Sequence, residues 1–217
     1  MSIKENLEKI KGSIPEQVTL VAVSKTKPVS DLQEAYEAGQ RILGENKVQE
    51  MVDKWESLPK DIQWHMIGHV QRNKVKYMID FVALIHGVDS FRLLKEINKR
   101  AKKADRTVDC LLQIHIAEED TKFGLDKKEL QEIVASEEFQ KLENINIKGL
   151  MGMATLTDDE NQVRREFRQL KSHFVELKTR LPEIDILSMG MSGDYKIAIE
   201  EGSTMVRIGS SIFGARK

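Results

Sequence analysis

The sequence has little of what marks an exported, membrane-embedded or nucleic-acid-binding protein. Its 217 residues include one cysteine, so no intrachain disulfide can form, and Cys110 lies in the apolar run CLLQI as a packed thiol. Lys plus Arg (34) balance Asp plus Glu (35), which removes an electrostatic reason to bind nucleic acid or acidic lipid. No apolar run approaches the ~20 residues that span a bilayer, and the charged N-terminus MSIKENLEKIKGS has no signal-peptide core. We therefore expect a cytoplasmic protein that acts on a small molecule, with no nucleic-acid and no membrane partner.

Further absences concern the fold and metals. The chain has no GxGxxG turn of the kind that begins an open dinucleotide-binding sheet. No histidines and carboxylates stand at helical metal-ligand spacing, so we expect no metal. Its four prolines fall at turns or helix ends and interrupt no strand. With 40% hydrophobic and 32% charged residues, the composition fits one globular unit, and we expect a single domain over residues 1–217.

Short apolar runs alternate with longer amphipathic segments along the whole chain. Eight runs have the character of buried strands, at 18–23, 41–46, 64–68, 81–88, 108–116, 145–153, 185–190 and 204–209. Helical patterns separate them, including one after WHMIG that is predicted to run through Ile79, and another helix is predicted over 3–12. Capping boxes predict three of the helix starts, at Ser30 with Gln33, Asp126 with Glu129, and Thr157 with Glu160.

Alternating strands and helices indicate an α/β protein whose parallel sheet is covered by helices. Eight such strands within 217 residues match the count and length of a (β/α)₈ TIM barrel, and an open doubly wound sheet usually has fewer strands. We therefore predict a single (β/α)₈ barrel with an extra N-terminal helix, and favour it over the open sheet.

A barrel brings the residues that follow its strands together at one rim. Lys25 follows the strand in TLVAVSKTKP, so its side chain is expected at the end of the sheet where active sites lie. Loops after the last two strands of such barrels commonly bind phosphate, and here they are GMSGD (190–194) and RIGSS (207–211). The two loops together favour a phosphate site, although each alone could be a tight turn with solvated serines.

Lys25 would also lie beside the eighth strand and therefore near Arg207 and Ser210. Burial and a neighbouring cation would lower the pKa of its amine and make it nucleophilic, although a lysine that merely extends from the strand end is the commoner case. A lysine, a phosphate cradle and a partner for a ring nitrogen are what pyridoxal 5′-phosphate (PLP) requires. As that partner, a permanently charged guanidinium disfavours ring protonation and weakens carbanion stabilisation.

Six segments resemble those of the pyridoxal phosphate homeostasis (YggS-type) proteins. They are VAVSKTKP, GENKVQE, WHMIGHVQRNK, GLMGMA, LSMGMSGD and STMVRIGSSIFGAR, in order and over nearly the whole chain. The resemblance implies a barrel similar to the N-terminal domain of alanine racemase, with PLP held as a covalent imine on Lys25. It also implies phosphate contacts from Ser192, Gly193, Gly209 and Ser210, Arg207 facing the pyridine nitrogen, and Asn46 lining the pocket.

The resemblance further implies a regulator of intracellular PLP (vitamin B6) and amino-acid homeostasis without strong catalytic activity. The alternative is a low-activity PLP-dependent amino-acid racemase, but the second acid/base that alanine racemases take from a C-terminal domain is expected to be missing, because the chain ends just after the eighth strand. A third interpretation, an imine-forming aldolase acting on a sugar phosphate, lacks an acidic residue immediately beside Lys25.

Four further residues near the rim are Tyr195, His65, His69 and Lys122. Tyr195 is expected to pack. His65 and His69 are expected to be hydrogen-bonded structural histidines, with contact between one of them and the ligand as the alternative. Lys122, in the loop after the fifth strand, is either an exposed loop lysine or a second amine that receives PLP during transfer to other proteins. We expect a monomer whose partners are PLP and apo forms of PLP-dependent enzymes.

Overall fold

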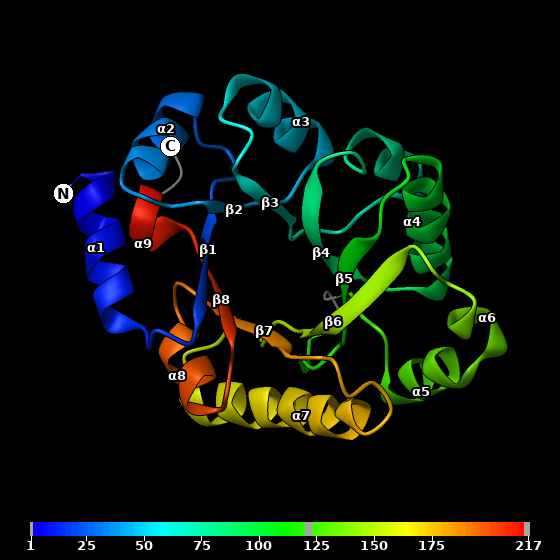
Figure 1. Cartoon of the computed structure of the whole chain (residues 1–217). Coiled ribbons are helices and arrows are strands. Elements are labelled where there is room, and N and C mark those ends of the chain that lie inside the picture. Colours follow the sequence, from blue (N-terminus) through cyan, green and yellow to red (C-terminus); the bar gives the residue numbers. More distant parts are fainter. Residues whose placement is uncertain (1, 120–122, 215–217) are drawn as a thin grey trace.

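Eight parallel strands close into a barrel in the computed structural model, which describes residues 2–119 and 123–214 (Figure 1). The strands are β1 (Thr19–Val23), β2 (Ile42–Glu45), β3 (Gln63–Met66), β4 (Val82–Val88), β5 (Val108–Gln113), β6 (Ile145–Met151), β7 (Ile186–Met191) and β8 (Met205–Ile208). Each strand pairs with the next in the sequence, and β8 pairs with β1. The predicted TIM barrel is thus confirmed.

Helices form a ring around the barrel (Figure 1). They are α1 (Ile3–Ser13), α2 (Val29–Glu37), α3 (Val48–Ser57), the 3₁₀ helix η1 (Arg72–Tyr77), α4 (Phe91–Lys103), α5 (Lys127–Ala135), α6 (Glu137–Gln140), α7 (Glu160–Lys178), α8 (Tyr195–Glu200) and α9 (Ser210–Phe213). The extra N-terminal helix is confirmed as α1, which lies beside α9 in Figure 1. In the part of the chain that the structure describes, no helix is long and apolar enough to cross a membrane.

The helix starts agree only in part with the sequence patterns. Asp126 and Glu129 form the predicted capping box of α5. The box predicted at Ser30 is wrong, because α2 already begins at Val29, after Pro28 in an extended conformation. The start predicted at Thr157 is also wrong, because the carboxylate of Asp159 accepts the first free N–H groups of α7.

Two other helical details differ from prediction. The segment between β3 and β4 was expected to be a helix through Ile79, but it is the six-residue 3₁₀ helix η1. The short helices α6 and α9 had no sequence signal and are four residues each. Helices of one turn bury too few residues to produce a periodic apolar pattern.

The barrel separates two layers of core. The larger layer packs the outer faces of the strands against the helices, and a second cluster fills the lumen with Val21, Leu84, Leu111, Met151 and Met205. Since side chains alternate along a strand, the residues two positions further along β4 and β8 also face the lumen. These are His86 and Arg207, so the lumen changes from apolar to polar toward the carboxyl ends of the strands.

Candidate functional site

Lys25 stands at the carboxyl end of β1, two residues beyond Val23. Ser24 is fully buried, whereas Lys25 is half-buried at the rim. β1 pairs with β8 in a register that sets Val21 opposite Arg207, so the segments that follow the two strands are neighbours. The backbones meet closely there: a Cβ added at Gly209 would lie 3.1 Å from the carbonyl oxygen of Val23. The predicted proximity of Lys25 to the eighth strand is therefore confirmed.

A buried ionic cluster contacts the backbone of Ser24, the residue before Lys25. The ammonium of Lys54, in α3, donates to Glu45 Oε1 at 2.6 Å, to Glu50 Oε1 at 2.7 Å and to the carbonyl oxygen of Ser24 at 2.8 Å. The hydroxyl of Ser24 donates to the same Glu45 oxygen at 2.6 Å. The cluster thus fixes the backbone immediately before Lys25.

The residue after Lys25 is fixed from the same cluster. Thr26 adopts a left-handed backbone conformation with φ of 64°, which is costly for a β-branched residue. Its N–H donates to Glu50 Oε1 at 2.5 Å. Lys25 is therefore held between two anchored residues, which reduces the conformational entropy lost when its amine binds a ligand.

Burial raises the pKa of the Glu45 carboxyl, against the opposing effects of Lys54 and Ser24. Its second oxygen, Oε2, is buried and has no hydrogen-bond partner among the described residues. Sequence reasoning missed this cluster. Glu50 and Lys54 have the i,i+4 spacing that is common on helix surfaces, and no local pattern shows that Glu45 faces the same point.

The turns after β7 and β8 lie side by side, as predicted. Ser192 Oγ accepts a hydrogen bond from the N–H of Gly209 at 3.2 Å. The β7 turn needs Gly190, whose φ is +97° and whose added Cβ would lie 2.6 Å from the Cβ of Ala198 in α8. Asp194 closes the turn by accepting from the N–H of Met191 at 2.5 Å.

Polar groups of these turns lie at the protein surface and line a groove. Ser210 begins α9 and is exposed. Ser192 and Gly193 line a groove together with Ser211, Lys9 and Lys196, and with the two acidic residues Glu160 and Asp194. The hydroxyls, backbone N–H groups and ammonium groups can bind an anion, and the carboxylate of Asp194 is itself bound to the N–H of Met191.

Arg207 extends into the lumen and is only 3% exposed. Its Nη1 donates to the carbonyl oxygen of Ser188 at 2.9 Å and to its hydroxyl at 2.6 Å, and Nη2 donates to the carbonyl oxygen of Gly152 at 3.1 Å. Burial lowers the pKa of Arg207 to about 10, and Asp194 opposes that shift. The guanidinium therefore remains charged at neutral pH.

Two buried histidines continue this network on the other side of the lumen. His86 Nδ1 lies 3.1 Å from Ser188 Oγ, and His86 Nε2 lies 3.0 Å from His65 Nδ1. Burial lowers the pKa of His65 to about 3, and burial together with the charges of His65 and Arg207 lowers that of His86. Both rings are neutral at pH 7. His65 was expected to be a hydrogen-bonded structural histidine and is one, whereas Ser188 was missed.

The remaining predicted residues lie at different places around the rim. Asn46 is half-buried after β2, where the backbone of Gly68 approaches so closely that an added Cβ would collide with it. His69 bonds through Nδ1 to Asp89 at 2.7 Å, as expected of a structural histidine. The hydroxyl of Tyr195 pairs with Ser13 in α1, which confirms a packing role.

Lys122 lies outside the described residues.

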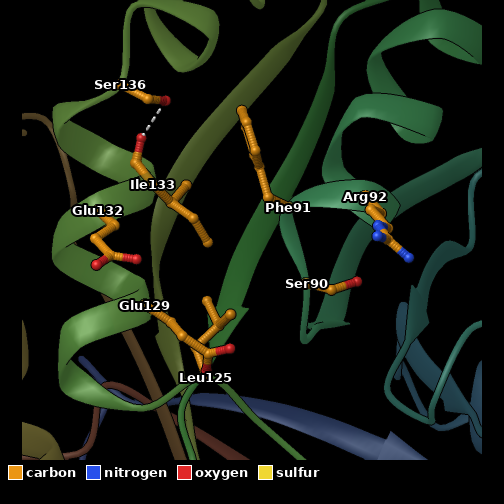
Figure 2. Close-up of a pocket in the computed structure, with 8 residues that line it drawn as sticks. All are labelled: Ser90, Phe91, Arg92, Leu125, Glu129, Glu132, Ile133 and Ser136. Atoms are coloured by element: carbon orange, nitrogen blue, oxygen red, sulfur yellow. Dashed lines mark hydrogen bonds between the residues drawn. The ribbon is translucent and has the colours of Figure 1, made fainter.

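The pocket drawn in Figure 2 lies between α4 and α5, and among its lining residues are Phe91, Leu125 and Ile133. It flanks β4 and β5, which are opposite β1 and β8 in the strand order of the ring. It is therefore separate from the site around Lys25 and Arg207.

Comparisons with known proteins identify the family of the chain. Over residues 1–217 the sequence matches the family described as alanine racemase, N-terminal domain. The pyridoxal phosphate homeostasis protein of Vibrio alginolyticus is 40% identical over 99% of this chain and 98% of its own length. The protein of the same name from Escherichia coli (strain K12) is 42% identical over 94% of this chain and 88% of its own length.

Solved structures give the same result at the level of the fold. PipY of Synechococcus elongatus PCC7942, solved with PLP bound, superposes with a TM-score of 0.90 at 34% identity, covering 98% of this chain and 100% of PipY. Alanine racemase of Clostridium difficile 630 has a TM-score of 0.81 at 18% identity, covering 99% of this chain and 60% of the racemase, and shares the fold alone. The chain thus belongs to the pyridoxal phosphate homeostasis proteins, within the alanine racemase N-terminal domain family.

Proposed function

We propose that this protein binds PLP at the mouth of the barrel as an imine on Lys25 and takes part in intracellular PLP and amino-acid homeostasis. One observation carries the proposal: a half-buried lysine, two linked turns suited to an anion and a buried guanidinium converge where β1, β7 and β8 end. The names of the relatives and the PLP bound to PipY support the choice of ligand.

The residues fit the three chemical parts of PLP. Ser192, Gly193 and Ser210 supply hydroxyl and backbone N–H groups for the phosphate. Gly209 belongs to the same cradle and orients the Ser192 hydroxyl through its N–H, and Asn46 lines the pocket. Three of the five N–H groups of Arg207 are used by protein acceptors, and the other two have no partner among the described residues. They are suited to the lone pair of a ring nitrogen.

The chemistry that PLP supplies is an aldehyde, which forms an imine with an amine and releases water, and a pyridine ring that withdraws electrons when its nitrogen is protonated. Arg207 opposes that protonation because it is already a cation and has no acceptor. Such a site binds the cofactor while weakening its power to stabilise carbanions. We therefore propose a carrier without strong catalytic activity.

The positions of two tyrosines favour a carrier over a racemase. Racemisation needs a second acid/base on the face of the imine opposite the lysine. Tyr195 is buried and its hydroxyl pairs with Ser13, while the hydroxyl of Tyr36 donates to Asp61. Both hydroxyls are therefore bound elsewhere. We further propose a cytoplasmic monomer that supplies PLP to apo-enzymes, with Lys122 as the candidate second amine in that transfer.

An absorption spectrum of the purified protein, with and without borohydride, tests the proposal. We expect a visible band after addition of PLP, its loss on borohydride reduction, and a covalent mass increase on the peptide that contains Lys25. Lys25→Ala should show no band, whereas Lys47→Ala, which changes an exposed lysine after β2, should keep it. A colourless protein that takes up no PLP would refute the proposal. Lys25-dependent exchange of a substrate α-hydrogen with solvent would show the racemase instead.

A further inference from the structure

Four side chains form a continuous hydrogen-bonded row across the lumen. They come from four strands: His65 from β3, His86 from β4, Ser188 from β7 and Arg207 from β8. The contact between His86 and Ser188 joins strands that are three apart in the ring, so the row crosses the barrel interior. All four residues are at most 4% exposed.

The chemistry of arginine sets the direction of every hydrogen bond in the row. A guanidinium only donates, so Ser188 Oγ is an acceptor at its 2.6 Å contact with Arg207. Within residues 2–119 and 123–214, the only other partner of that hydroxyl is His86 Nδ1. The hydroxyl oxygen could accept a second hydrogen bond, but its buried proton would then have no acceptor, because arginine cannot accept it. We therefore assign the hydroxyl proton to the contact with His86, whose Nδ1 carries no proton.

The same reasoning extends to the second histidine. A neutral imidazole with a bare Nδ1 carries its proton on Nε2. Nε2 of His86 then donates to His65 Nδ1 at 3.0 Å, and the proton of His65 is on its own Nε2. The titratable groups that act on His86 are Arg207, which is charged, and His65, and both disfavour a second proton on His86, while Asp194 acts on Arg207.

We propose that Ser188, His86 and His65 are positioning residues that fix Arg207 through a one-way hydrogen-bond chain, so that its two remaining N–H groups face a ligand whose aromatic ring nitrogen is unprotonated. The part that concerns the ligand rests on the proposed function. The part that concerns the direction of the hydrogen bonds depends only on the protein and not on a ligand. Reversal would make Ser188 Oγ accept from both neighbours and leave its buried hydroxyl hydrogen without an acceptor among the described residues.

The direction of these hydrogen bonds can be measured in the wild-type protein without a bound ligand. In protein labelled with ¹⁵N at histidine, long-range ¹H–¹⁵N correlation spectra distinguish protonated from bare ring nitrogens. At pH 7 we expect both His65 and His86 as single tautomers protonated at Nε2. A proton on Nδ1 of either ring would overturn the proposal, as would a mixture of tautomers. These outcomes do not depend on whether PLP binds.

Ser188→Ala tests the positioning role, with Ser203→Ala as a matched control. Ser203 is equally buried and donates to carbonyl groups of β7 and β8 without touching Arg207. We expect Ser188→Ala to release His86 into mixed tautomers and to broaden the ε ¹H–¹⁵N signal of Arg207, both in the apo protein, and Ser203→Ala to change neither. Unchanged spectra in Ser188→Ala would overturn the role.

Measurements with PLP bound provide a second test of the same variants. A hydrogen bond to a charged group is worth enough to change affinity about tenfold, so PLP should bind about tenfold more weakly to Ser188→Ala than to wild type. The ring ¹⁵N shift of labelled PLP should report an unprotonated nitrogen in wild type. A protonated nitrogen there would overturn the ligand part. Failure of PLP to bind at all would instead refute the proposed function and leave the tautomer result standing.

Discussion

Acid should destabilise the folded protein through its buried histidines. His65 is 4% exposed and His86 is fully buried, and burial is the main cause that lowers the pKa of both. Below the ordinary pKa of about 6.5, an unfolded chain takes up protons at these rings and the folded chain does not. The stability present above pH 6.5 is therefore lost as the pH falls toward the folded-state pKa values.

The magnitude for His65 follows from its folded pKa of about 3. Between pH 7.5 and pH 5 the unfolded state gains most of one proton at this residue while the folded state gains almost none. Integration of the linkage relation over that interval gives a loss of about 2 kcal/mol in the free energy of unfolding. The loss from His86 has the same sign.

Urea denaturation at pH 7.5 and pH 5 measures the loss in wild type and in His65→Gln. Glutamine keeps an oxygen that can accept the proton of His86 but does not titrate. The variant should lose about 2 kcal/mol less than wild type over this pH interval. Circular dichroism at pH 7.5 would first establish that the variant is folded. Equal losses in the two proteins would refute the reasoning, because His65 would then titrate alike in the folded and unfolded states.

Three further substitutions test the supports of the site by urea denaturation at neutral pH. Lys54→Met leaves the buried carboxylate of Glu45 without its cation and should cost about 3–5 kcal/mol, part of which the added change Glu45→Gln should restore; a cost below about 1 kcal/mol would contradict the buried pair. Gly190→Ala forces a side chain into φ of +97° against α8 and should cost about 1–3 kcal/mol, whereas a neutral effect would mean that the turn rearranges freely. Glu166→Gln replaces an acceptor of the N–H groups of two mouth loops with an amide that donates, and should cost about 1–3 kcal/mol and speed proteolysis of those loops; unchanged cleavage would count against it.

The sequence allowed correct prediction of the strands because strand signals are local. All eight apolar runs became strands of the barrel, since each is short, buried and bounded by turn residues. Helix starts were less reliable. At α7 the sequence pattern placed the cap at Thr157 with Glu160, but Asp159 caps the helix by accepting from the N–H groups of Asn161 and Gln162. The choice of cap depends on side-chain geometry that a pattern of residue types does not contain.

The candidate site divides in the same way. Lys25 and the serine and glycine turns were predicted because they follow strands, and Arg207 because it lies near the end of the last strand; strand ends of a closed barrel must meet at one rim. Lys54 and Ser188 were not predicted. A buried lysine in a helix resembles any amphipathic lysine, and one strand serine resembles another, until the partners that surround them are known.

By itself, the sequence determined the strand and helix order, the closure of the sheet and the family. Hydrophobic periodicity and motif spacing are properties of residues close together in the sequence, so they can be recognised without the structure. Tertiary structure alone decided that Glu45 and Lys54 pair next to the backbone that carries Lys25, and that two histidines and a serine from three strands form one hydrogen-bonded row with Arg207. Those contacts depend on the register of the barrel strands and on burial. In a buried site, an unpaired charge or a wrong histidine tautomer destabilises the fold. Neither register nor burial is apparent from the local sequence.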